Sequence, residues 1–133
     1  MMRKWLFLLP IISLSFAACG GNKSSSPAQA VRSYMEAIEA FDVAKAKTLV
    51  CAPQRAQVEN SLTAFGDTSK LGETFAMSLE DMQYEEQSND GSIAVVSVKG
   101  QMKLSFLGQE EIQEINEKHT VIQQGGRWLV CDP

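Results

Sequence analysis

The sequence predicts an α+β domain in which N-terminal helices pack on a curved antiparallel sheet. Between residues 27 and 65, apolar side chains recur at the spacing of one helix face. From Ala94 to Phe106 the even-numbered residues are apolar or Gly and most odd-numbered ones are polar, which is typical of a strand with one buried face. The turn motif Asn89-Asp90-Gly91 precedes that strand. Helices grouped before antiparallel strands define this fold class.

Three helices are expected in the first half of the domain. Ser26-Pro27 joins a capping residue to one suited to the first helical position, so the first helix covers about residues 27–40. Asp42 is a good cap for a short second helix that ends near Val50. Pro53 then opens a third helix.

Four strands are expected in the second half. The Ala94–Phe106 strand is the clearest, and Gly100 within it indicates a bend or bulge. An antiparallel partner is expected before it, near residues 79–88, and another after it, near residues 110–123. A short last strand follows a Gly-Gly turn and covers residues 127–131.

The first 18 residues predict an export signal. Two basic residues precede an uncharged, mostly apolar run that ends in small residues before Cys19. The ending Phe16-Ala17-Ala18-Cys19 resembles the lipobox of bacterial lipoproteins, in which the signal is cut before a Cys that carries lipid. Phe16 stands where that motif usually has Leu. The alternatives are cleavage without lipid and an uncleaved anchor, although the run of 14 residues is shorter than the ~20 of a spanning helix.

The predicted organisation is therefore a discarded signal, a tether and one domain. Residues 1–18 form the signal, residues 19–26 a small polar tether, and residues 27–132 the α+β domain. The lipoprotein resemblance implies palmitate-type anchoring in the cell envelope. Gly20, where an Asp would imply inner-membrane retention, implies the outer membrane facing the periplasm in a Gram-negative cell. A net charge of −4 argues against nucleic-acid binding, which needs a basic surface.

Two cysteines remain once Cys19 is assigned to lipid. Export places Cys51 and Cys131 where disulfides persist, so a structural disulfide is favoured over two separate buried thiols. Neither lies in a C-x-x-C motif, which argues against a redox enzyme. No His or Cys lies near either one in sequence, so a metal site is poorly supported.

The order of elements resembles the nuclear-transport-factor-2-like fold, also called cystatin-like, and within it small secreted bacterial lipoproteins. The resemblance implies a cone between the long helix and the sheet. It also implies relatives that include isomerases, dehydratases and non-enzymatic binders, and frequent homodimers formed through the sheet. It rests on three segments: the first helix with Pro27, Tyr34, Ile38 and Phe41-Asp42; the turn and strand Asp90-Gly91-Ser92-Ile93-Ala94-Val95-Val96; and the ending Gly125-Gly126-Arg127-Trp128-Leu129-Val130-Cys131.

A cavity in this cone is the natural candidate site, because concave apolar pockets are the default binding sites. His119 is the single histidine, and we interpret it as a partly exposed strand residue in preference to a general base. No cofactor motif or metal-binding spacing is present in the sequence. The possible lining residues are Tyr34, Met35, Ile38, Val98, Met102, Leu104, Phe106, His119 and Trp128.

Three functions remain open. The first is a lipid-anchored, non-enzymatic domain that binds a small apolar ligand or another envelope protein, because the even face of residues 94–106 is apolar. The second is a small lyase or isomerase with His119 and Tyr34 as its first candidate groups. Two or more ionisable side chains converging in the cavity would overturn the first function in favour of this one, and a cavity without His119 and Tyr34 would exclude it. The third is an adaptor with a filled cone that binds proteins through an acidic face. Two acidic clusters could form that face: Glu73, Glu80, Asp81, Glu85, Glu86 and Asp90, and Glu110, Glu111, Glu114 and Glu117.

Overall fold

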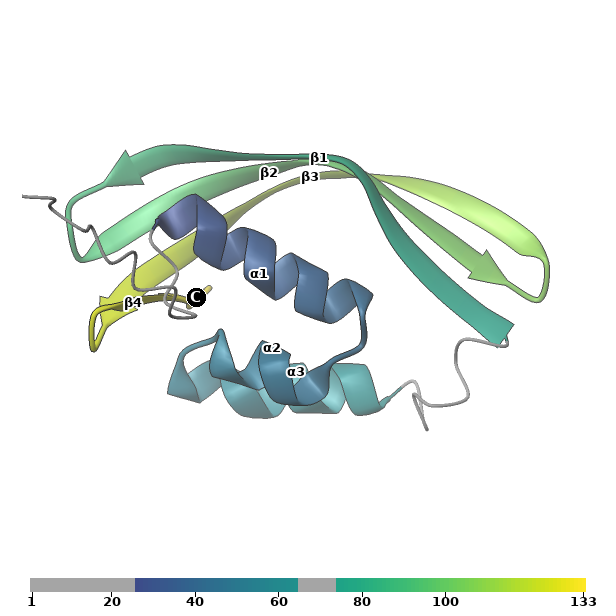
Figure 1. Ribbon diagram of the computed structural model, residues 1–133, viewed down its shortest axis with the longest axis horizontal. Coiled ribbons are helices and arrows are strands. Elements are labelled where there is room, and N and C mark those ends of the chain that lie inside the picture. The colour runs from purple at the N-terminus through teal and green to yellow at the C-terminus, as the bar shows by residue number, and fades with distance from the viewer. Residues whose placement is uncertain (1–25, 65–73) are drawn as a thin grey trace, which may run out of the picture.

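The computed structural model describes residues 26–64 and 74–133. The predicted signal, Cys19 and most of the tether lie outside the described residues. A four-stranded antiparallel sheet curves over the helices (Figure 1). Helix α1 (Pro27–Glu39) lies directly beneath it, and α2 (Val43–Thr48) and α3 (Ala52–Thr63) form a further layer. This α+β architecture confirms the predicted fold class.

The helices begin at the residues that the capping signals predict. In α1 (Pro27–Glu39) the Ser26 side chain accepts a hydrogen bond from the Gln29 backbone N–H at 3.1 Å. In α2 (Val43–Thr48) Asp42 has the same role toward Lys45. Helix α3 (Ala52–Thr63) starts one residue before the expected Pro53 and has no side-chain cap.

The sheet has the strand order β1-β2-β3-β4, so every strand pairs with its neighbours in sequence. Strands β2 (Ile93–Phe106), β3 (Gln109–Gln124) and β4 (Arg127–Val130) agree with the predicted ranges within two residues. Strand β1 (Phe75–Asn89) is longer than the expected 79–88. Its first residues pair with the end of β2, and this pairing is not visible in their own sequence pattern.

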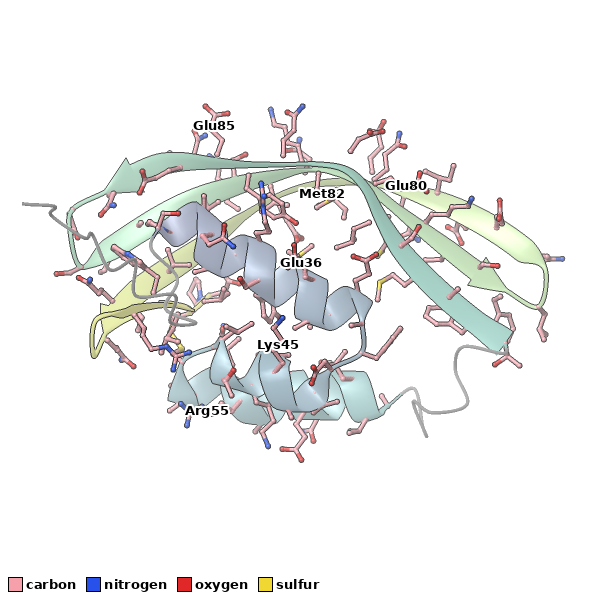
Figure 2. The ribbon with its side chains drawn as sticks, viewed as in Figure 1. Glu36, Lys45, Arg55, Glu80, Met82 and Glu85 are labelled. Carbon is pink, nitrogen blue, oxygen red and sulfur yellow. A yellow bond between two sulfur atoms is a disulfide. The ribbon has the colours of Figure 1, made fainter. Side chains whose placement is uncertain are left out.

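Gly100 marks the bend of the sheet, as its position in the strand predicts. The pairing of β1 with β2 shifts between Glu80 and Gln83, so that Asp81 and Met82 face the single residue Gly100 in a β-bulge. Asp81 has a positive φ of 52° there. A Cβ on Gly100 would collide with the Met82 sulfur and approach the Glu80 carbonyl oxygen to 3.0 Å. A larger residue here would require the Met82 side chain to move and the bulge backbone to shift slightly. The sheet turns sharply near this point (Figure 2).

The core lies between α1 and the first half of β2. Val31 and Met35 of α1 pack with Ala94, Val96 and Val98, and all five are buried. The buried face therefore follows the predicted even-numbered residues at this end of the strand.

The prediction of a buried face along the whole of Ala94–Phe106 is wrong at its far end. Phe106 is 56% exposed, and Met102 and Leu104 are partly exposed. Beyond the bulge the hairpin of β2 and β3 extends past α1, so none of the described helices covers it (Figure 1).

The chain end is fixed to the start of α3 by a disulfide between Cys51 and Cys131, with their Cα atoms 5.3 Å apart. Backbone hydrogen bonds support it, from Cys51 N–H to Val130 O at 2.9 Å and from Cys131 N–H to Thr120 O at 2.8 Å. The disulfide fits an exported protein in an oxidising compartment. Among the described helices, none has the length and apolar character needed to cross a membrane.

Candidate functional site

A cavity of about 490 Å³ opens between α1, α3, the sheet and the chain end. This volume falls in the usual range of small-molecule sites. One part of its wall is apolar and consists of Met35, Ile38, Phe41, Val58, Leu62 and Met77. The other part is polar and consists of Tyr34, Gln54, Gln57, Ser61, Glu117, His119 and Asp132, and Pro133 completes the lining.

The structure brings four of the nine proposed cavity residues together in this lining: Tyr34, Met35, Ile38 and His119. The others lie elsewhere. Val98 and Trp128 are buried in the core, and Met102, Leu104 and Phe106 lie on the part of β2 beyond the bulge. The cavity wall opposite α1 is therefore formed by α3 and β3, and not by the apolar face of β2.

His119 is held between two carboxylates. Its Nδ1 lies 2.7 Å from Asp132 Oδ2, and its Nε2 lies 2.9 Å from Glu117 Oε1. The imidazole side chain is only 12% exposed, whereas Glu117 remains 50% exposed and Asp132 33%. Sequence reasoning favoured a partly exposed residue here. The structure agrees that His119 is a strand residue of intermediate exposure, and it adds a carboxylate partner on each ring nitrogen.

The carboxylates determine the charge of this cluster. Burial alone lowers the pKa of His119, but the hydrogen bonds to Asp132 and Glu117 outweigh it and raise the pKa to about 9. The hydrogen bond to His119 lowers the pKa of Glu117. Burial raises the pKa of Asp132, yet its bonds to His119 and to the Thr120 N–H lower it overall. At neutral pH the cluster is thus an imidazolium between two carboxylates, with one negative charge in excess.

Different parts of the chain place the three groups. Val96 pairs with His119 and Val98 with Glu117, so both β3 side chains share the inward face of the buried valines. Asp132 follows the disulfide residue Cys131 in sequence, and its Oδ1 accepts a hydrogen bond from the Thr120 N–H at 2.8 Å. Asp132, which lies after the last strand, is not among the candidate residues of the sequence analysis.

Tyr34 connects the cluster to α1. Its ring meets the His119 ring edge-on, with centroids 6.1 Å apart. Burial, followed by the negative charges of Asp132 and Glu117, raises the pKa of its hydroxyl. Tyr34 therefore stays neutral and can donate a hydrogen bond at physiological pH.

The predicted acidic face is interrupted. Strand β2 lies between β1 and β3 and places Lys99 and Lys103 among the carboxylates. Lys103 forms an ion pair with Glu110 at 3.3 Å. Glu73 of the first cluster lies outside the described residues. Within the described ranges, no group of three or more His, Cys, Asp or Glu has a geometry that could hold a metal ion.

The chain matches no protein-family model and no curated protein sequence. Its fold is similar to the solution structure of a SEC-C motif containing protein from Rhodopseudomonas palustris. The two share 17% identity with a TM-score of 0.56, over 83% of this chain and 78% of that one.

A second similar structure is a crystal structure from Thiobacillus denitrificans, assigned as a calcium/calmodulin-dependent protein kinase type II association domain. The identity is 12% and the TM-score 0.54, over 79% of this chain and 89% of that one. The helices and curved antiparallel sheet of the present chain are consistent with the nuclear-transport-factor-2-like fold of that domain. At such low identity the likeness concerns the fold alone, and function must be argued from the site.

Proposed function

We propose that this chain is an exported, lipid-anchored protein whose domain binds a small, mostly apolar ligand in the cavity between α1 and α3. The cavity itself carries this proposal, because it combines a suitable volume with an apolar wall and a few polar groups at one end. Lipid attachment at Cys19 rests on the sequence motif, and the disulfide supports export. In a cell with two membranes we place the protein on the outer membrane, facing the periplasm.

The open cavity favours a small ligand over a protein partner. An adaptor would have a filled cone and a continuous acidic surface, whereas this cone is hollow and lysines divide the acidic residues. The shape of the cavity therefore supports binding inside the domain more strongly than binding on the outer face of its sheet.

The convergence of Glu117, His119 and Asp132 meets the condition stated from the sequence for preferring a second function, a lyase or isomerase. Its first candidate groups, His119 and Tyr34, both line the cavity. Acid–base catalysis works best with groups whose pKa lies near the working pH. Here the pKa of His119 is raised to about 9 and the pKa values of both carboxylates are lowered, so all three shift away from neutrality. Both nitrogens of His119 are also engaged by the carboxylates. We therefore favour binding over catalysis. Chemical turnover of a ligand by the unaltered chain that is lost in Glu117→Gln would instead favour catalysis.

Filling the cavity tests the proposed binding function. Gln57 and Ser61 lie one helical turn apart on α3, line the cavity and are exposed to it. We expect Gln57→Trp with Ser61→Trp to weaken binding of the neutral apolar dye Nile red by about tenfold or more, because the indole rings occupy the ligand volume. The measurement is dye fluorescence titrated against protein.

A matched control shifts the same two changes by one residue. Ala56 and Asn60 are exposed positions on α3 with the same spacing, and they do not line the cavity. Ala56→Trp with Asn60→Trp should leave dye affinity unchanged. Equal affinity of both double variants, or no binding by the unaltered chain, would contradict the proposal.

A further inference from the structure

The charge of the cavity points to the kind of ligand it selects. Its lining holds the carboxylates of Glu117 and Asp132 and the imidazole of His119, and the described lining residues include no Lys or Arg. We infer that the ligand carries a cationic nitrogen, such as an alkylammonium group, which binds at Glu117 while an apolar body fills the rest of the cavity. This inference rests on the proposed binding function and adds the ligand class.

Glu117 is the carboxylate with more remaining capacity for a ligand, because it is more exposed than Asp132 and has fewer hydrogen bonds. Asp132 already uses one oxygen for His119 and the other for the Thr120 N–H. Glu117 bonds His119 through Oε1, lines the cavity, and keeps half of its side chain exposed. A carboxylate has about four acceptor positions, so Glu117 can accept further hydrogen bonds from an ammonium group.

The charge balance favours a cation over an anion. One carboxylate compensates the imidazolium of His119, and the second leaves a negative charge at the polar end of the cavity. A carboxylate ligand would add a like charge there, whereas an ammonium group would neutralise the excess. The amide oxygens of Gln54 and Gln57 can accept its remaining N–H donors.

The rest of the cavity suits a flexible apolar body. Met35 and Met77 line it from α1 and β1, and methionine side chains adapt to ligands of irregular shape. Ile38, Phe41 and Leu62 complete an apolar surface opposite the polar cluster. Apolar and negative parts of one cavity together match a cationic amphiphile.

Three probes with one chain and different head groups test the inference: octylammonium, octanol and octanoate. By isothermal titration of the purified chain at pH 7, we expect octylammonium to bind about tenfold more tightly than octanol, and octanoate to bind most weakly. Because these probes are compared on the unaltered chain, the result does not depend on a variant folding. Equal binding of octanol and octylammonium overturns the inference while leaving the proposed binding function intact. Failure of all three probes to bind overturns both.

Two variants then locate the preference. Glu117→Gln should abolish the advantage of octylammonium over octanol. Glu85→Gln removes the same charge from β1 on the side of the sheet away from the helices (Figure 2), so it should keep the full preference. A preference that survives Glu117→Gln, or that falls equally in both variants, would show that the overall negative charge selects the cation and would overturn the inference.

Discussion

At the scale of single residues, His119 shows how neighbouring charges can reverse the effect of burial. A histidine that is 12% exposed would by itself become harder to protonate, yet two carboxylates raise its pKa to about 9. The raised pKa means that folding stabilises the protonated form. The cluster therefore makes stability depend on pH in a direction that can be measured.

We expect the free energy of unfolding to fall as the pH rises from about 6.5 to 9. The pKa of His119 is higher in the folded state than its ordinary value of 6.5, so its contribution is complete below pH 6.5 and is lost as the pH passes about 9. A shift of this size corresponds to roughly 3 kcal/mol. Denaturant unfolding at several pH values measures it, and His119→Gln should flatten the dependence in this range.

A direct measurement accompanies this prediction. His119 is the only histidine in the chain, so a single imidazole titrates in an NMR spectrum. We expect its midpoint well above 6.5, and Asp132→Asn should lower it because the largest favourable hydrogen bond is lost. A midpoint near 6.5 in the unaltered chain would contradict the ion cluster.

On the acid side, the lowered pKa values of Asp132 and Glu117 mean that their stabilisation of the fold is lost as the pH falls below about 4.

At the scale of elements, the disulfide connects two segments that are distant in sequence and form one wall of the cavity. It fixes the start of α3 to the residue after β4, so that Gln54 of α3 donates a hydrogen bond to the Asp132 backbone carbonyl. The same covalent bond places Asp132 beside His119. Stability and site geometry are therefore coupled through Cys51 and Cys131.

Removing the disulfide should destabilise the domain without changing its fold. Cys51→Ser with Cys131→Ser opens a loop of 80 residues, for which the chain-entropy model gives roughly 4–5 kcal/mol. The backbone hydrogen bonds of Cys51 and Cys131 remain and keep the strands aligned. Urea unfolding with and without reductant measures the effect. Reductant should lower the urea midpoint of the unaltered chain and leave that of the double variant unchanged. Equal midpoints of the unaltered chain and the variant without reductant would contradict the disulfide.

At this scale much of the fold could be predicted from the sequence. The Ser26 and Asp42 caps, the alternation in the first half of β2 and the bend at Gly100 are local signals, and each appears at the predicted place. The turn at Leu107-Gly108, where both residues have positive φ, pairs Phe106 with Gln109 and sets the β2–β3 register. Reading that register along the strands would have placed His119 and Glu117 opposite the buried valines.

At the scale of the whole molecule, the cavity and the predicted lipid anchor together support the proposal of a binding domain held near a membrane. The anchor depends on Cys19, which lies outside the described residues, so it stays a prediction from the sequence. The fold neighbours do not test it, because a likeness at 12–17% identity concerns the fold alone.

Globomycin, which inhibits lipoprotein signal peptidase, tests the anchor. With the inhibitor present, we expect a precursor that retains residues 1–18 to accumulate. In a separate test without the inhibitor, we expect the mature protein to stay with the membrane unless lipid attachment is prevented. Phe16→Leu restores the usual motif and serves as the control, which should also be sensitive to the inhibitor. Normal processing in its presence would exclude lipidation at Cys19.

The sequence by itself determined the α+β class, the order of the elements and the sharp bend of the sheet, because caps, alternation and turns act over a few residues. Only the tertiary structure decided which residues form the cavity. Asp132 reaches His119 because a disulfide and the β3–β4 pairing bring the chain end beneath the sheet. The inner face of β2 beyond the bulge stays partly exposed because the described helices end before it. Such long-range contacts depend on the packing of distant segments, which no local pattern records.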